Sequence, residues 1–220
     1  MVTFWRYQAN TVNSLIVLGN GESRTAVQLD LLQKNFTLIG CNAVHRDITV
    51  QHLICCDHRM VCEALENQNN ISSRIYVRER FYRAFKKIQK NKNIFQLPSV
   101  PTTGTIKRDD PEHWGSGPYA VLVASLQDIE QIFLVGFDLY SSNDKFNNIY
   151  KGTKNYNNAD SNPVDPSYWI YQISEIMKLY DNKEYVVVNY KDWEMPKEWL
   201  LDNVSFMDIE NFKKYYQGIA

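Results

Sequence analysis

The sequence predicts a single α/β domain whose mostly parallel β-sheet is flanked by helices. Apolar runs of strand length alternate with amphipathic stretches of helix length along most of the chain, which is the pattern of parallel α/β folds. The chain has 220 residues, enough for one substantial core but short for two. Its hydrophobic content of 44% and charged content of 22% are those of an ordinary globular protein.

The elements of the first half follow one another in a regular order. The first apolar run ends in a glycine-rich turn, and the next stretch carries Ala26, Leu29 and Leu32 at the spacing of one helix face. Further short apolar runs predict strands, and the amphipathic segments between them predict helices. The expected strands are Ser14–Leu18, Phe36–Cys41, His52–Cys56, Arg74–Val77 and Ile94–Leu97, and the expected helices are Thr25–Gln33, Arg59–Asn67 and Arg80–Lys90.

The second half contains two long connections. Residues 98–115 hold three prolines and two glycines, which predict a loop. Residues 141–164 carry seven asparagines and hardly an aliphatic side chain, so we expect a polar loop that acts as a lid over a site. The other elements expected here are helices Gly117–Gln127 and Pro166–Tyr180, strands Gln131–Val135 and Tyr185–Asn189, and one or two helices in the aromatic tail from Trp193 to Tyr216.

Charge and hydropathy exclude several classes of protein. The 24 Lys and Arg residues balance 25 Asp and Glu residues, so no overall field draws the chain to nucleic acid or to an anionic membrane. No segment approaches the ~18 consecutive apolar residues of a membrane-spanning helix, and the first residues do not resemble a secretion signal. We therefore expect a cytoplasmic protein without a transmembrane segment.

The four cysteines lie in or beside predicted strands. Cys41, Cys55, Cys56 and Cys62 form no zinc-type pair, which predicts reduced thiols packed in the core. A metal cluster of Cys55 and Cys56 with His52 and His58 is the alternative. Adjacent residues of a strand point to opposite faces, which disfavours that cluster.

Four strands end in small or polar residues, and their ends predict a ligand site. In an open parallel sheet, ligands bind beyond the carboxyl ends of the strands. The four ends are Gly19-Asn20-Gly21, Cys41-Asn42, Cys56-Asp57 and Gly136-Phe137-Asp138, and Ser23 can cap the helix that follows the first. The glycine pattern is neither a dinucleotide fingerprint nor a Walker loop, so those enzyme classes are disfavoured.

Taken together, these segments resemble a known family. The motifs are Gly-Asn-Gly-x-Ser at 19–23, Cys-Asn at 41–42, Gly-Ser-Gly at 115–117 and Ile-Phe-Leu-Val-Gly-Phe-Asp-Leu-Tyr at 132–140. In this order, over about residues 14 to 190, the sequence resembles the bacterial sialyltransferases of glycosyltransferase family 42 and the related motility-associated glycosyltransferase-like proteins. The resemblance implies a Rossmann-like nucleotide-sugar-binding domain over 1–190, with its lid at 141–164, and a helical appendage over 191–220.

The same resemblance implies an activity and a set of site residues. The family binds a CMP-linked sugar and transfers the sugar to an acceptor hydroxyl without metal, so no cofactor is expected. Tyr140 would donate its hydroxyl to the leaving phosphate, and Tyr150 is one substitute for a second tyrosine, which here is Phe146. The remaining substrate-binding residues implied are Gly19, Asn20, Gly21, Ser23, Asn42, Asp57, Ser116, Gly117, Gly136, Phe137 and Asp138.

The sequence departs from the family at the catalytic base. The family uses a histidine after the lid, whereas no histidine follows His113 in this chain. Asp165 is the expected substitute, because a carboxylate can deprotonate an acceptor hydroxyl.

Two other functions and one further partner stay open. The missing histidine favours a binding or structural module without turnover. A pyrophosphoryl transferase like the pterin diphosphokinases is also possible, with Mg²⁺ held by Asp57 and Asp138. Segment 74–92 holds eight basic residues and one acidic residue, which predicts either a solvated helix face or a site for an anionic partner.

Overall fold

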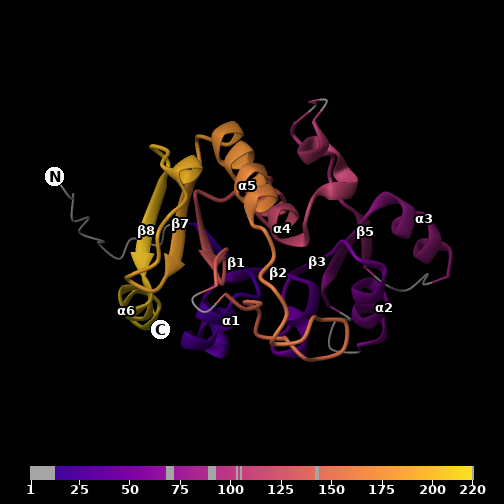
Figure 1. The fold of residues 1–220 in the computed structure, drawn as a ribbon, viewed down its shortest axis with the longest axis horizontal. Helices are drawn as coiled ribbons and strands as arrows, with labels where there is room; N and C mark the ends of the chain where they lie inside the picture. Colours follow the sequence, from indigo (N-terminus) through magenta and orange to yellow (C-terminus); the bar gives the residue numbers. More distant parts are fainter. Residues whose placement is uncertain are drawn as a thin grey trace.

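The computed structural model describes residues 13–67, 72–88, 93–102, 104, 106–141 and 144–219, and these form a Rossmann-like α/β fold around one sheet (Figure 1). The sheet has eight strands in the order β5-β4-β3-β2-β1-β6-β7-β8, and every neighbouring pair is parallel. The strands are β1 Ser14–Leu18, β2 Thr37–Cys41, β3 His52–Cys55, β4 Arg74–Val77, β5 Ile94–Gln96, β6 Gln131–Val135, β7 Glu184–Asn189 and β8 Val204–Asp208. The predicted fold class is confirmed.

The strand order reverses between β1 and β6. The chain runs outward from β1 to β5 and then returns to place β6 on the other side of β1. Leu18 pairs with Val135, so the turns that follow β1 and β6 start side by side. A reversal of this kind is where open α/β sheets place their ligands.

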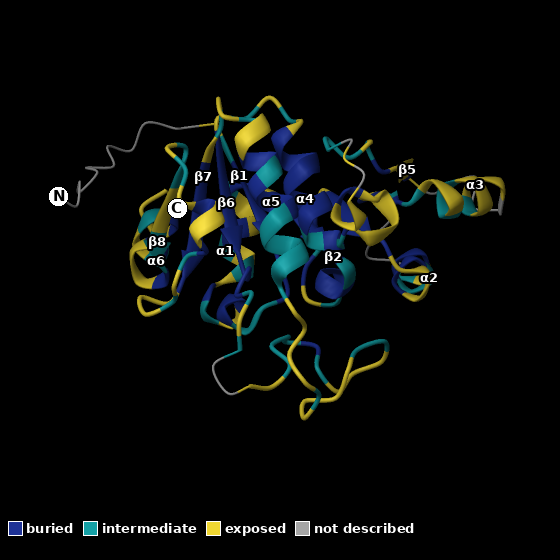
Figure 2. Cartoon of the chain, turned by 45° about the horizontal axis from the view of Figure 1, so that its top comes forward, coloured by how far each residue is buried: buried dark blue, intermediate teal, exposed yellow. Residues whose placement is uncertain are grey.

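Helices cover both faces of the sheet and separate two hydrophobic cores. Helices α4 and α5 pack on one face, and α1, α2 and α6 pack on the other. Figure 2 shows the buried strands and α4 between the outer helices. The helices are α1 Leu29–Asn35, α2 His58–Glu66, α3 Glu79–Ile88, α4 Ser116–Ser125, α5 Ser167–Leu179 and α6 Ile209–Gln217.

Helix α4 is buried on nearly every side because its sequence is apolar and small almost throughout. All its residues except Gly117 are buried, including Ser116 at its start and Ser125 at its end. The Ser125 hydroxyl bonds the Val121 carbonyl at 2.9 Å, so this polar group has a partner within the core. A helix that is apolar all round belongs in the interior, and this one presents its first turn to the carboxyl edge of the sheet.

Two segments differ from the sequence-based prediction. In place of a continuous helix Thr25–Gln33, a 3₁₀ turn over Glu22–Ala26 precedes α1, because the Arg24 side chain turns inward and binds the Gly19 carbonyl at 2.9 Å. The tail contains a strand as well as a helix, since β8 pairs with β7 before α6 begins. The sequence of β8 includes the polar residues Ser205 and Asp208, so it lacks the continuous apolar run from which the other strands were predicted.

The cysteines mostly follow their prediction. Cys41, Cys55 and Cys56 are buried free thiols, whereas Cys62 on α2 is only partly buried. Burial raises the pKa of Cys41 to about 12 and that of Cys56 to about 11. Cys55 and Cys56 lie in the two different cores, as strand alternation requires. Within the described ranges, no group of three His, Cys, Asp or Glu side chains is arranged to hold a metal ion.

The basic segment forms β4 and the exposed helix α3, and residues 89–92 lie outside the described part. Arg80 pairs with Glu112 at 3.2 Å, and Arg83 pairs with Glu79 on the same helix. An anionic partner for this segment stays a prediction. In the part of the chain that the structure describes, no helix is long and apolar enough to cross a membrane.

Candidate functional site

A cavity of about 340 Å³ lies at the carboxyl ends of β1, β2, β3 and β6. The first turn of α4 and residues of the lid, here the loop 141–164, complete its wall. Figure 1 shows the lid running along this edge of the sheet. Most of the predicted site residues line this cavity, namely Gly19, Asn20, Gly21, Asn42, Asp57, Ser116, Gly117, Gly136, Phe137 and Asp138.

The glycines of the two central turns let these turns pack against each other. A Cβ atom on Gly19 would lie 2.3 Å from the Gly136 carbonyl oxygen, and Gly136 itself has a φ of +78°. A Cβ atom on Gly21 would lie 2.4 Å from the Asp138 carboxyl carbon. Their first role is therefore to seat one turn on the other, which forms the floor of the cavity.

Asn20 is tied to the protein by its whole side-chain amide. Its nitrogen donates to the Cys41 carbonyl at 3.2 Å and to the Tyr156 hydroxyl at 3.3 Å, and its oxygen accepts from Arg24 at 3.0 Å. Asn20 is only 9% exposed. It holds the ends of β1 and β2 together with the lid, so it positions the site more than it offers groups to a ligand.

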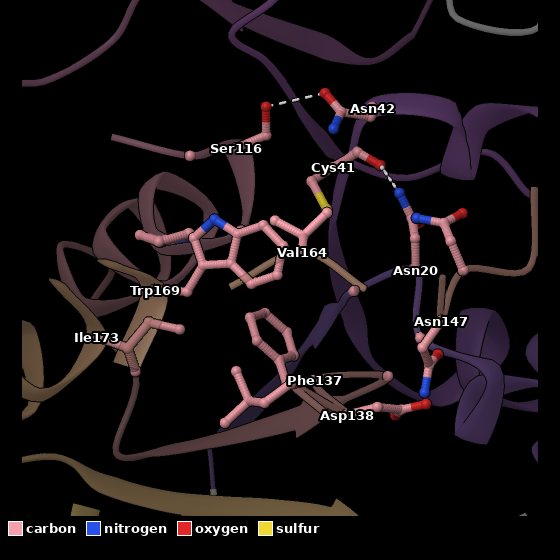
Figure 3. A pocket seen from close by; sticks show the side chains of 18 of the residues that line it. Asn20, Cys41, Asn42, Ser116, Phe137, Asp138, Asn147, Val164, Trp169 and Ile173 are labelled. Carbon is pink, nitrogen blue, oxygen red and sulfur yellow. Dashed lines mark hydrogen bonds between the residues drawn. The ribbon is translucent and has the colours of Figure 1, made fainter. Parts of the chain in front are cut away.

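Asn42 and Ser116 form a second polar link across the cavity (Figure 3). The Ser116 hydroxyl accepts from the Cys56 backbone N–H at 3.1 Å and donates to the Asn42 side-chain oxygen at 2.8 Å. Asn42 has a φ of 51°, a left-handed conformation that asparagine tolerates. This bond fixes the amide orientation, and within the described chain the Asn42 amide nitrogen has no protein acceptor, so it is a donor available to a ligand.

Asp138 is committed to the turn after β1. Its carboxylate accepts from the Ser23 backbone N–H at 2.9 Å, from the Ser23 hydroxyl, and from the Asn189 amide at 3.5 Å. Ser23 is buried behind this carboxylate and does not line the cavity. The two residues lock the turn in place.

Asp57 is the carboxylate at the cavity that the protein leaves uncommitted. It is the N-cap residue of α2, yet its side chain makes no capping bond, and no hydrogen bond or ion pair joins it to the described residues. Aspartate is among the most favourable N-cap residues, and a cap contributes about 1 kcal/mol. Its exposed carboxylate lines the cavity instead.

Besides Ser23, three predicted residues lie outside the cavity lining: Tyr140, Tyr150 and Asp165. Tyr140 is 42% exposed and packs on Trp193. Tyr150 is buried, where its hydroxyl accepts from Arg24 at 2.6 Å and donates to Asp47 at 2.5 Å, and burial raises its pKa. Asp165 is exposed and accepts from the Ser167 backbone N–H at 2.9 Å and hydroxyl at 3.0 Å, which lowers its pKa.

The lid has no helix or strand in its described part, as its composition predicts, but it is well anchored. The Ile149 N–H donates to the Asn20 carbonyl at 3.0 Å. The Arg46 guanidinium donates to the Thr153 hydroxyl at 2.7 Å, and Asn155 donates to Glu63 at 2.8 Å. The lid residues that line the cavity are Ser141, Phe146, Asn147, Asn148, Pro163 and Val164.

The sequence predicted only Phe137 of an apolar wall of the cavity, and its other residues were missed. Figure 3 shows Trp169, Ile173 and Phe137 opposite the asparagines. Trp169 and Ile173 come from the first half of α5, at the i, i+4 spacing of one helix face, which is the signal that could have found them. Trp114 also lines the cavity, and its indole N–H is buried without a hydrogen-bond partner among the described residues.

Arg78 brings a positive charge to the same cavity. Its guanidinium donates to the backbone carbonyls of Cys56 at 3.0 Å and Trp114 at 2.8 Å, and also to that of Pro111. These carbonyl acceptors are neutral, so they hold the Arg78 side chain in place without neutralising its positive charge. The cavity therefore joins a polar wall, which carries the Arg78 guanidinium with the carboxylates of Asp57 and Asp138, to an apolar wall.

Comparisons with known proteins found matches only among solved structures, because no family model and no curated protein matches the chain. The α-2,3-sialyltransferase Cst-I of Campylobacter jejuni matches with a TM-score of 0.55 and 12% identity, covering 85% of this chain and 79% of that one. A single-residue mutant of the α-2,3/8-sialyltransferase CstII has a TM-score of 0.45 and 14% identity, with coverage of 79% and 80%. The likeness to Cst-I confirms the predicted resemblance at the level of the fold.

Proposed function

We propose that this chain binds a CMP-linked sugar in the cavity and transfers the sugar to an acceptor hydroxyl without metal. The observation that carries the proposal is the cavity itself, which lies at the reversal of the strand order in a fold shared with a sialyltransferase. Polar side chains that can form hydrogen bonds and an apolar wall face each other across the cavity.

The donor would bind through its phosphate and its ring systems. The backbone N–H groups of Ser116 and Gly117 open α4, where the helix dipole favours an anion, and the Asn42 amide is directed by Ser116. The cytosine or the sugar ring would pack on the wall of Trp169 and Phe137. Arg78 adds charge compensation for the phosphate.

Transfer needs one bond to form and one to break. The acceptor oxygen attacks the anomeric carbon, the bond from that carbon to the phosphate oxygen breaks, and its electron pair leaves with CMP. The acceptor proton must pass to a base. We assign this role to Asp57 rather than Asp165, because Asp57 lines the cavity uncommitted while Asp165 is engaged by Ser167 outside it.

Calorimetry with CMP, UDP, GDP, ATP and their sugars, each with EDTA or with Mg²⁺, tests the proposal. We expect CMP and a CMP-linked sugar to bind in EDTA, and the sugar nucleotide to release CMP slowly. A ligand at about 100 times its Kd stabilises the fold by about 2.7 kcal/mol, so thermal unfolding gives an independent readout. Binding that requires ATP and Mg²⁺ would instead support the pyrophosphoryl transferase.

A binding module without turnover is the second candidate. Tyr140 and Asp165, the two catalytic residues expected from the sequence, do not line the cavity, and this favours a binding module. CMP binding without any release of CMP from the sugar nucleotide, at any pH, would establish this candidate in place of the transferase.

A further inference from the structure

Three aromatic rings form an exposed row beside the cavity, which we call the aromatic ladder: Tyr140, Trp193 and Phe206. The Trp193 ring lies 6.5 Å from that of Tyr140 and 6.2 Å from that of Phe206, with interplanar angles of 34° and 17°. Tyr140 is 42% and Phe206 38% exposed. The two outer rings are thus exposed, and Trp193, which contacts both, is half-buried.

The middle ring of the ladder is held in place from below. The Trp193 indole N–H donates to the Asp138 carbonyl at 2.7 Å. Behind it lies the buried ring of Trp199, 6.4 Å away, whose own N–H donates to the Ile170 carbonyl at 3.0 Å. The ladder is therefore built on the core, and a ligand that stacks on it meets a preorganised surface.

The ladder continues from the wall of the cavity. Asp138 and Leu139 line the cavity, and Tyr140 is the next residue in the chain. Phe206 lies on β8, the edge strand beyond β7, and Figure 1 shows that α4 and α5 lie over the more central strands. The first ring of the ladder therefore follows the cavity wall directly in the chain, and ring contacts link it through Trp193 to Phe206 on β8.

Acidic residues predominate in the segment that carries Trp193 and Phe206. Residues 190–208 include Asp192, Glu194, Glu198, Asp202 and Asp208 but only two basic residues, Lys191 and Lys197. Burial, and then the charges of Glu198 and Glu194, raise the pKa of the Tyr140 hydroxyl. Such a surface repels anionic lipid and phosphate, whereas its carboxylates are acceptors for hydroxyl groups.

We propose that the aromatic ladder is a binding site for a neutral oligosaccharide, which is the acceptor of the transfer reaction. This rests on the proposed function, because the cavity next to the ladder must hold the sugar donor. A pyranose ring has one face of C–H groups that packs on an aromatic ring and a rim of hydroxyls that donate to carboxylates. Successive sugar units on successive rings would lead the terminal hydroxyl toward the cavity.

The test uses an array of neutral and acidic oligosaccharides with the full chain, Phe206→Ala and Phe95→Ala. Phe95 is a matched control, because it is a 40% exposed phenylalanine on β5, the edge strand at the opposite end of the sheet. We expect the wild type and Phe95→Ala to bind neutral glycans equally. Phe206→Ala should bind about three- to tenfold more weakly, the loss of one aromatic contact, with CMP affinity unchanged in both variants.

Four outcomes would overturn the proposal. These are no neutral glycan retained by the wild type, an equal loss in the two variants, preference for vesicles of phosphatidylglycerol, or a dimer in light scattering that Phe206→Ala dissociates. CMP binding measured on the same samples separates the two proposals. Glycan binding without CMP binding would retain the ladder as a site and refute the donor cavity, and the reverse result would refute the ladder alone.

Discussion

Replacing Asp57 by asparagine removes one proton acceptor from the cavity and keeps its size. The structure indicates a small effect on folding, because the Asp57 carboxylate is exposed and makes no capping bond or ion pair with the described residues. Asparagine is as good an N-cap as aspartate. We therefore expect Asp57→Asn to change the free energy of unfolding by no more than about 0.5 kcal/mol.

The effect on turnover should be much larger. A positioned general base contributes ~10²- to 10⁴-fold to the rate, which corresponds to ~2.7–5.5 kcal/mol of activation free energy. Asparagine keeps a side-chain oxygen that accepts hydrogen bonds, so contacts to ribose hydroxyls would largely survive. The expected result is a large loss of transfer with a change in CMP affinity of less than about threefold.

The assay pairs single-turnover release of CMP from a CMP-linked sugar with calorimetric titration of CMP. Asp165→Asn is the matched control, and it should keep wild-type turnover because Asp165 binds Ser167 outside the cavity. Lost turnover in Asp165→Asn with normal turnover in Asp57→Asn would refute the reasoning and restore Asp165 as the base. An equal loss of CMP affinity and turnover in Asp57→Asn would make Asp57 a ribose ligand.

The remaining predictions concern the cavity walls and the lid. Asn42→Ala should weaken CMP binding with little change in unfolding temperature. Asn20→Ala should lower the free energy of unfolding by about 1–3 kcal/mol, because its buried partners lose their hydrogen bonds. The opposite pattern in thermal unfolding would contradict both assignments. Tyr150→Phe should lose about 1 kcal/mol and make the lid cleave faster in limited proteolysis without ligand, and an unchanged cleavage rate would show that its hydroxyl does not anchor the lid. The hydrogen bond from Arg46, with one from Asn155, lowers the pKa of Glu63 below 4.5 in the folded state, so its stabilisation is complete above that pH and is lost as the pH falls through the lowered value. The protection of lid amides against hydrogen exchange, measured relative to their intrinsic exchange rate at each pH, should fall at acidic pH in the wild type and depend less on pH in Glu63→Gln.

The strand ends show how far the sequence alone reaches. Alternating apolar runs and amphipathic segments predicted strands at seven of the eight observed positions, because burial on both faces of a parallel sheet demands continuous apolar residues. The same rule located the cavity, since parallel strands bring their carboxyl ends to one edge. Strand β8 was not predicted, because an edge strand with an exposed face tolerates polar residues such as Ser205.

The roles within the site were decided by tertiary contacts. Asn20 and Asn42 are equivalent in sequence, as asparagines that follow strands. The Asn20 amide is bound by Arg24 and Cys41, whereas the Asn42 amide nitrogen has no acceptor among the described residues. Asp57 and Asp138 also follow strands. The Asp138 carboxylate differs because it accepts a hydrogen bond from Ser23 in the turn after β1.

The sequence by itself determined the parallel sheet, the edge at which the cavity lies and the polar loop 141–164, because these follow from local periodicity and composition. The tertiary structure decided which carboxylate is uncommitted, which wall is apolar and where the aromatic ladder lies. Each of these depends on side chains from distant segments, such as Trp169 with Phe137 or Trp193 with Phe206. Hydrogen-bond commitment and ring packing are properties of pairs, and no pattern along one segment records a partner from another.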